Sequence, residues 1–142
     1  MGFDRAMKIS LSGLEAERLA MELIASNLAN INTTRSVLGG PYHRRAAILS
    51  EKPLSFSDEL DKAEYNLGGG VEVAEVKEDN SALPKVYNPS HPDADAHGFV
   101  TMPNVNYSHE MVDMVDVSRL YQANITAFNA TKKMMQDTMQ LP

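Results

Sequence analysis

Apolar residues recur every three or four positions through the last third of the chain, from Ser108 to Gln140. The positions of this repeat are Met111, Met114, Ser118, Tyr121, Ile125, Phe128, Lys132, Met135 and Met139. Steps that alternate between three and four return to one side of an α-helix, and only Ser118 and Lys132 interrupt the apolar row. Ser108 is a suitable N-cap. A helix of about 50 Å with one narrow apolar row needs a partner of similar length.

The same repeat occurs at the other end of the chain. Its positions are Met7, Leu11, Leu14, Arg18, Met21, Ala25 and Leu28. Ile24 and Ile31 widen the row, and Asn32-Thr33-Thr34 ends it, because these side chains compete for helical hydrogen bonds. Two rows of comparable length at opposite ends of one chain predict two long helices that pack as an antiparallel pair.

Composition excludes several classes of protein. The chain has 142 residues and a formal net charge of −6, which argues against nucleic acid as a partner because phosphate binding needs a basic surface. The short basic cluster His43, Arg44 and Arg45 is predicted to consist of solvated strand residues. The chain has no cysteine, so it has no disulfide, thiolate nucleophile or thiolate metal site.

The apolar residues are spread too thinly for a membrane span. No uninterrupted apolar run approaches the roughly 18 residues that a transmembrane helix requires, so we expect no direct membrane insertion. The N-terminus is amphipathic and lacks the compact apolar core and small-residue cleavage site of a secretory signal. We therefore expect any export to proceed without a cleaved signal of that kind.

The middle of the chain, about 34–104, has β character. Strands are predicted over 42–49, over 71–78 with a bulge where the alternation changes phase at Ala74, and over short pieces at 85–87 and 99–102. A helical turn is predicted near 58–64. The predicted fold is mainly α, with long N- and C-terminal helices packed as a coiled-coil-like pair and a small β-containing middle segment. The expected domains are 1–33, 34–104 and 105–142.

A cluster of four potential metal ligands occurs at His91, Asp93, Asp95 and His97. Imidazole and carboxylate groups can hold a divalent metal, so a small metal-dependent enzyme is one possible interpretation. The alternating spacing, stiffened by Pro92, instead favours a turn-rich loop with Asx-type hydrogen bonds. Because the chain also lacks a nucleophile elbow and a Gly-rich phosphate loop, we expect no cofactor and no catalysis.

Several stretches together resemble one family. They are Ser12-Gly13-Leu14, residues 24–33, 39–45, 87–95 and 98–106, and the C-terminal segments 110–114, 118–119, 121–124 and 128–132. The N- and C-terminal stretches resemble the signatures of bacterial flagellar rod, hook and hook-associated proteins, and the middle ones resemble the proximal rod branch. Residues 55–66 match nothing in this pattern.

The resemblance implies a structural subunit of the proximal rod of the flagellar basal body. Such a subunit would polymerise through its terminal helices into the drive shaft that transmits torque across the periplasm. The implied partners are other copies of the chain, other rod subunits, MS-ring and rod-adaptor proteins, distal rod proteins and the flagellar type III export apparatus.

The expected assembly interface combines matched signature residues with repeat positions. The signature contributes Leu14, Asn27, Asn30, Asn32, Tyr121, Asn124, Phe128 and Asn129, and the repeat adds Leu11, Met21, Leu28, Met111, Met114, Ile125 and Met135. An unpaired buried amide costs roughly 1–3 kcal/mol, so the asparagines are predicted to fix the register between helices.

A different class of protein fits the helical repeats alone. A free-standing coiled-coil adaptor would use the same two rows, but it would be a stable dimer in solution and would not depend on rod subunits.

Overall fold

The computed structural model describes residues 2–37, 39–52 and 69–140. Its elements are, in order, α1 (Gly2–Ala29), β1 (Arg45–Glu51), β2 (Val71–Glu78), β3 (Lys85–Tyr87), β4 (Phe99–Thr101) and α3 (Tyr107–Met139). Two long helices flank two small antiparallel β-hairpins, so the predicted mainly α fold is confirmed.

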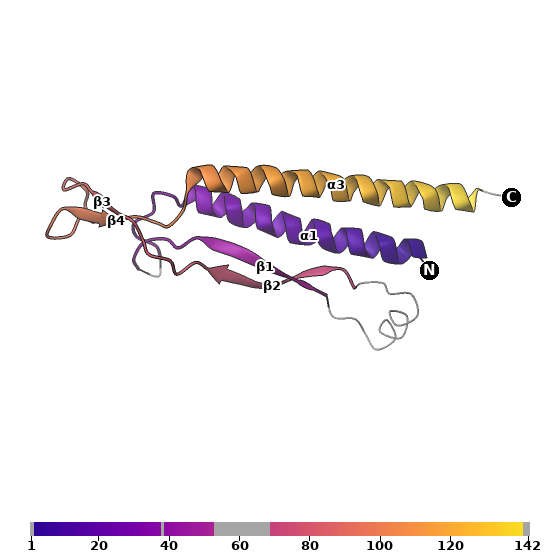
Figure 1. Ribbon diagram of the computed structural model, residues 1–142, viewed down its shortest axis with the longest axis horizontal. Coiled ribbons are helices and arrows are strands. Elements are labelled where there is room, and N and C mark those ends of the chain that lie inside the picture. The colour runs from indigo at the N-terminus through magenta and orange to yellow at the C-terminus, as the bar shows by residue number, and fades with distance from the viewer. Residues whose placement is uncertain (1, 38, 53–68, 141–142) are drawn as a thin grey trace.

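The two helices run antiparallel along most of their length (Figure 1). Glu110, at the start of α3, contacts Asn27 near the end of α1, while Asn124 reaches back to Glu17. Both ends of the chain therefore lie at the same end of the molecule, where α3 continues past the first turn of α1 (Figure 1). The predicted antiparallel pairing is confirmed.

α1 is the middle layer of the molecule, with α3 on one side and the β1–β2 hairpin on another (Figure 1). This position explains why its buried residues, Ala16, Ile24 and Asn27, are spread along the helix. The only buried residues of α3 are Glu110 and Thr131, because α3 is covered on one side alone. The two helices have the same repeat of apolar residues, but α1 is covered on two sides and α3 on one.

The β1–β2 hairpin pairs Arg45 with Glu78 at one end and Glu51 with Val71 at the other. Ile48 lies opposite Glu75 and Leu49 opposite Val73, so Ala74 is the extra residue of a bulge, as the change of phase predicted. Strand β1 begins at Arg45, three residues later than predicted.

A serine on α1 holds the start of β2. The Ser12 hydroxyl donates to the Ile9 carbonyl at 2.7 Å and accepts from the Val71 amide at 3.1 Å. Gly70, which precedes the strand, has φ +97°, and a Cβ there would lie 2.6 Å from the Ser12 oxygen. Only glycine combines this backbone conformation with so close an approach to the helix.

The second hairpin, β3–β4, lies beyond the end of the helix pair that is opposite to the chain termini (Figure 1). Its pairing joins Tyr87 to Phe99, whose rings contact edge to face with centroids 5.3 Å apart. Val100 is almost fully buried, and it anchors this short hairpin.

The ends of the helices differ slightly from the predicted ones. Asn106, not Ser108, caps α3, and its side chain accepts from the His109 amide at 3.2 Å. Ser108 lies inside the first turn, because the helix starts at Tyr107. At the end of α1, the Asn30 side chain donates to the Ser26 carbonyl at 2.9 Å.

The face of α3 that is turned toward α1 is offset from the predicted apolar row. Its covered positions, which we call the seam, are Glu110, Asp113, Met114, Val117, Ser118, Tyr121, Asn124, Phe128, Thr131 and Met135. Met114, Ser118, Tyr121, Phe128 and Met135 were predicted correctly. At Met111, Ile125 and Lys132 the residue before the predicted one is covered instead: Thr131 is buried and Lys132 is exposed, for example.

The row predicted for α1 is also only partly covered. Leu14, Met21 and Leu28 are half-buried, whereas Leu11, Arg18 and Ala25 are exposed. The cause is the second neighbour of α1: the hairpin covers residues such as Ser12 and Ala16 that a single-partner repeat leaves outside.

The helical turn predicted near 58–64 and the unmatched stretch 55–66 lie outside the described residues. Within the described part of the chain, neither long helix has an apolar stretch of the length and hydropathy needed to cross a membrane.

Candidate assembly site

A polar cluster joins both helices to β1, and Asn27 is at its centre. The Asn27 side chain is fully buried, and all four of its hydrogen-bonding positions are used. Its amide nitrogen donates to the Arg45 carbonyl at 2.9 Å and to a Glu110 carboxylate oxygen at 3.0 Å. Its oxygen accepts from the Tyr42 hydroxyl and from the Arg45 amide, both at 2.9 Å. Asn27 therefore holds three segments together: α1, the segment 42–45 and the start of α3.

Glu110 is the second fully buried member of this cluster. The Arg44 guanidinium donates to Glu110 at 2.5 Å and to Asp113 at 3.0 Å. Burial alone would lower the pKa of Arg44, but the hydrogen bond to Glu110 and the negative charges of Glu110, Asp113 and Asp79 raise it above the ordinary value. The guanidinium thus stays charged and compensates the buried carboxylate, as a buried acid requires.

The loop before α3 is tied to the same cluster by Asn104. Its side-chain oxygen accepts from the Arg44 amide at 2.8 Å, and its nitrogen donates to the Asp79 carbonyl and the Ser81 hydroxyl. Asn104 therefore ties the segment after β2 and the loop before α3 to Arg44, the residue that pairs with Glu110.

Farther along the helix pair, one close contact sets the spacing. The Asn124 amide donates to Glu17 at 2.8 Å, across the two helices. A Cβ on Gly13 would lie 3.0 Å from the Asn124 nitrogen, so glycine permits this approach. The other carboxylate oxygen of Glu17 is buried and has no hydrogen-bond partner among the described residues.

Large apolar side chains remain on the outside of α3 after this packing. They are Met111, Val112, Val115, Leu120, Ile125, Met134 and Met139, with exposed fractions between 38% and 69%. A stable folded helix that shows this many apolar residues to solvent has the character of a surface that other chains cover.

Three of the four potential metal ligands at 91–97 hold this turn in place instead; the His91 ring accepts from the Asp93 amide at 3.1 Å. Asp93 accepts from Thr34 at 2.8 Å and pairs with Arg35 at 2.7 Å, which ties this turn to the segment after α1. Asp95 accepts from the Phe99 and His97 amides, and these two bonds lower its pKa below the ordinary value. Among the residues that the structure describes, no three such side chains gather in a way that could hold a metal ion.

Two family descriptions match the ends of the chain. "Flagella basal body rod protein" matches residues 7–35, and "Flagellar basal body rod FlgEFG protein C-terminal" matches residues 96–141. These ranges contain almost all of the helix pair, including Asn27, Asn124 and Glu110.

Relatives match over nearly the whole chain. The flagellar basal-body rod protein FlgC of Bacillus subtilis is 43% identical, with 96% of this chain and 95% of the relative covered. FlgC of Borreliella burgdorferi is 37% identical, with coverage of 99% and 98%. FlgC of Salmonella typhimurium is 38% identical, with coverage of 94% and 92%. The chain belongs to the FlgC family of flagellar basal-body rod proteins. It is a structural subunit of the proximal rod of the basal body, not an enzyme.

The asparagines that the family resemblance singled out have different positions in this structure. Asn27 and Asn124 hydrogen-bond across the helix pair, as expected of residues that fix register. Asn30 bonds within the end of α1, and Asn32 and Asn129 are exposed.

The remaining residues of the predicted assembly interface divide into two groups. Leu14, Met21, Leu28, Met114, Tyr121, Phe128 and Met135 are half-buried between the elements of one chain. Leu11, Met111 and Ile125 are exposed. The exposed group is the one available for contacts between rod subunits.

The sequence analysis missed the charged half of the polar cluster. Arg44 was predicted to be a solvated strand residue, but its side chain is only 28% exposed and bridges two acids of α3. Tyr42 and Glu110 are buried too. A signal did exist: Tyr42 and Arg44 lie in the segment 39–45 that resembles the rod family, although nothing in the repeat links them to Glu110.

Proposed function

We propose that the chain polymerises through α1 and α3, with other copies of itself and with other rod subunits, into the torque-transmitting shaft of the proximal rod. The observation that carries the proposal is the number of large apolar residues exposed along α3, from Met111 to Met139. A helix pair that served only its own chain would gain nothing from these residues, because exposed apolar surface contributes no burial.

The polar cluster supports a mechanical role. It ties the helix pair to the β1–β2 hairpin through charged and amide hydrogen bonds whose partners are far apart in sequence. Breaking a buried charge pair costs about 3–5 kcal/mol, so the two parts of the subunit should turn together rather than hinge. A shaft that transmits torque needs subunits that resist such internal bending.

The finer partners follow from the resemblance to proximal rod proteins. We include among them the MS-ring and rod-adaptor proteins on one side and the distal rod on the other. Passage through the flagellar type III apparatus without a cleaved signal, and a final position across the periplasm, belong to the same proposal.

A pair of neighbouring substitutions on α3 tests polymerisation. Ile125 and Thr126 are both exposed. We expect Ile125→Asp to abolish motility in a strain whose own copy of the gene is deleted, because it places a charge in a contact between subunits. Thr126→Asp, the matched control, replaces a neighbouring exposed residue that is already polar, and it should leave motility close to normal.

The result is interpreted from purified basal bodies and protein levels. We expect Ile125→Asp protein at normal amounts in cells but absent from rods. Full motility of this variant at normal protein levels would contradict an assembly role for the outer side of α3.

A further inference from the structure

We propose that a hollow beside the β3–β4 hairpin receives the C-terminal end of helix α3 from a second copy of this chain. This inference rests on the proposed polymerisation and names two surfaces that would meet end to end.

The two ends of the elongated subunit carry its most exposed large apolar side chains. Among the described helices and strands, Met139 is 69% exposed and Tyr87 is 65% exposed, more than any other large apolar residue. Met139 ends α3, next to the chain termini, whereas Tyr87 is on β3, beyond the opposite end of the helix pair (Figure 1). Apolar surface at both ends of a long subunit favours contacts between one end of a copy and the other end of the next.

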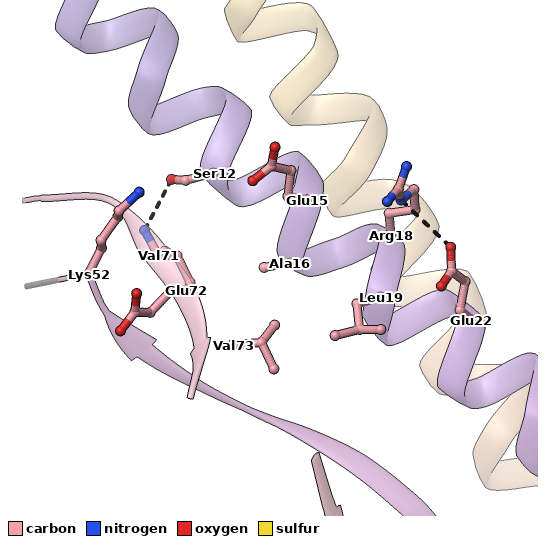
Figure 2. Close-up of a pocket in the computed structure, with 10 residues that line it drawn as sticks. All are labelled: Ser12, Glu15, Ala16, Arg18, Leu19, Glu22, Lys52, Val71, Glu72 and Val73. Carbon is pink, nitrogen blue, oxygen red and sulfur yellow. Dashed lines mark hydrogen bonds and ion pairs between the residues drawn. The ribbon is translucent and has the colours of Figure 1, made fainter. Parts of the chain in front are cut away.

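The hollow lies between the β3–β4 hairpin and the segment that follows α1. Its volume is about 240 Å³, far more than the roughly 10–15 Å³ that one water molecule needs. Its lining residues are Val86, Val100 and Met102, which are apolar, and Asn32, Asn88 and His91, which are polar. Val86 is 50% exposed, so the hollow is accessible from outside. By contrast, half of the residues that line the larger groove between α1 and β2 are charged (Figure 2).

The polar lining of the hollow offers hydrogen-bond donors. Because the Asp93 amide donates to Nδ1 of His91, the hydrogen of the neutral ring is on Nε2, where it can be donated. Within the described part of the chain, the side-chain amides of Asn32 and Asn88 have no hydrogen-bond partner. An apolar hollow with such donors fits a partner that brings an apolar side chain together with hydrogen-bond acceptors.

The C-terminal end of α3 has both of these features. Every described residue after Met135 is exposed, because α3 continues past the first turn of α1 (Figure 1). The last four carbonyls of a helix have no partner inside it, and among the described residues only that of Asp137 accepts, from the Gln140 amide. No basic residue lies in the last turn to offset the partial negative charge of the helix end. Met139 supplies the apolar side chain.

The occupant of the hollow comes from another molecule. Within one chain the hollow and Met139 are at opposite ends of α3, whose 33 residues span about 50 Å. The two surfaces are different, so the contact is heterologous. Repeated from copy to copy, a heterologous contact that does not close gives a helical filament.

Cross-linking in cells tests this contact, and the absence of native cysteine gives a clean background. The test variant combines Val86→Cys in the hollow with Met139→Cys on α3, expressed in a strain that lacks its own copy, and a short bismaleimide is added. We expect a ladder of covalent dimers and higher multimers from the double variant. Each single variant should remain monomeric.

The matched control combines Val86→Cys with Leu120→Cys. Leu120 is 57% exposed on the same helix, but it lies roughly 28 Å before Met139 at 1.5 Å per residue. We expect at least fivefold less multimer from this pair, and an equally strong ladder would overturn the proposed contact.

A charge change tests the role of the helix end. Asn88→Asp places a carboxylate against the partial negative charge of α3 and should reduce the ladder of the test variant at least threefold. Asp137→Lys, added to that variant, should restore it, because it puts a cation in the last turn. A ladder that Asn88→Asp leaves unchanged would overturn the proposed recognition of the helix end.

The outcomes separate this contact from polymerisation itself. A motile Val86→Cys and Met139→Cys variant that gives no ladder would overturn the end-to-end contact and leave the rod function intact. Dimers from Met139→Cys alone would show that two helix ends meet each other, which also overturns it. If the unmodified chain fails to restore motility, the proposed function is at fault.

Discussion

The two ends of the helix pair are held in different ways. Where β1 joins, Asn27 and Glu110 are fully buried and their hydrogen bonds are shared among three segments. In the middle of the pair a hydrogen bond from Asn124 to Glu17 crosses the helices, and at the end near the chain termini Met139 is 69% exposed. The comparison teaches that buried polar groups fix the joined end of the subunit, whereas exposed apolar side chains occur along the whole of α3, from Met111 to Met139.

The strongest test removes the buried acid at the joined end. Glu110→Ala leaves Asn27 short of an acceptor and Arg44 without its closer partner, and we expect it to lower the free energy of unfolding by about 3 kcal/mol. The matched control is Asp113→Ala, because Asp113 binds the same guanidinium but is 42% exposed. That change should cost about 0–1 kcal/mol. Urea denaturation followed by circular dichroism measures both, and equal losses would refute the special role of the buried cluster.

A second test concerns the close contact in the middle of the pair. Asn124→Ala should cost about 1–3 kcal/mol, because neither carboxylate oxygen of Glu17 then has a partner among the described residues, and one of the two is buried. Gly13→Ala should be nearly neutral in the unmodified chain, since its Cβ would press on Asn124 and offset the gain in helix propensity. In the Asn124→Ala background the same change should stabilise by about 0.5–1 kcal/mol. A gain of that size without the Asn124 change would show that the helices do not approach so closely.

The smallest expected effect lies beyond the joined end, in the β3–β4 turn. The Phe99 and His97 amides lower the pKa of Asp95, so their stabilising effect is complete above about pH 3.9, the value in unfolded chains. It is lost as the pH falls through the lower value in the folded turn. We expect amide exchange at Phe99, corrected for its intrinsic pH dependence, to rise in that acidic range. Asp95→Ala should exchange quickly at every pH, and unchanged protection in that variant would refute the role of the carboxylate.

Periodicity predicted both helices, and two rows of comparable length at opposite ends of one chain predicted their antiparallel pairing. It misplaced three levels of the seam, where Glu110, Asn124 and Thr131 are covered instead of Met111, Ile125 and Lys132. The repeat assumes that covered residues are apolar. Glu110 is covered because Arg44 and Asn27 satisfy it, and these residues are 66 and 83 positions away.

The predicted interface could not be divided into internal and external contacts for a related reason. A single repeat predicts one partner for each helix, whereas α1 packs against both α3 and a hairpin (Figure 1). Leu11 and Leu14 are equivalent in the repeat, yet only Leu14 is half-buried. Which residues remain for neighbours depends on where the hairpin lies, and that is decided by contacts such as Ser12 with Val71.

The contact between Asn124 and Glu17 spans 107 positions of the chain, and it has a consequence for the order of folding. Every contact between the two helices waits for the last third of the chain, since α1 has no helical partner before α3 is present. Closing so long a loop is entropically unfavourable and makes the pairing slow compared with local structure. A chain that emerges from its N-terminus should therefore leave α1 without its helical partner until its final residues arrive.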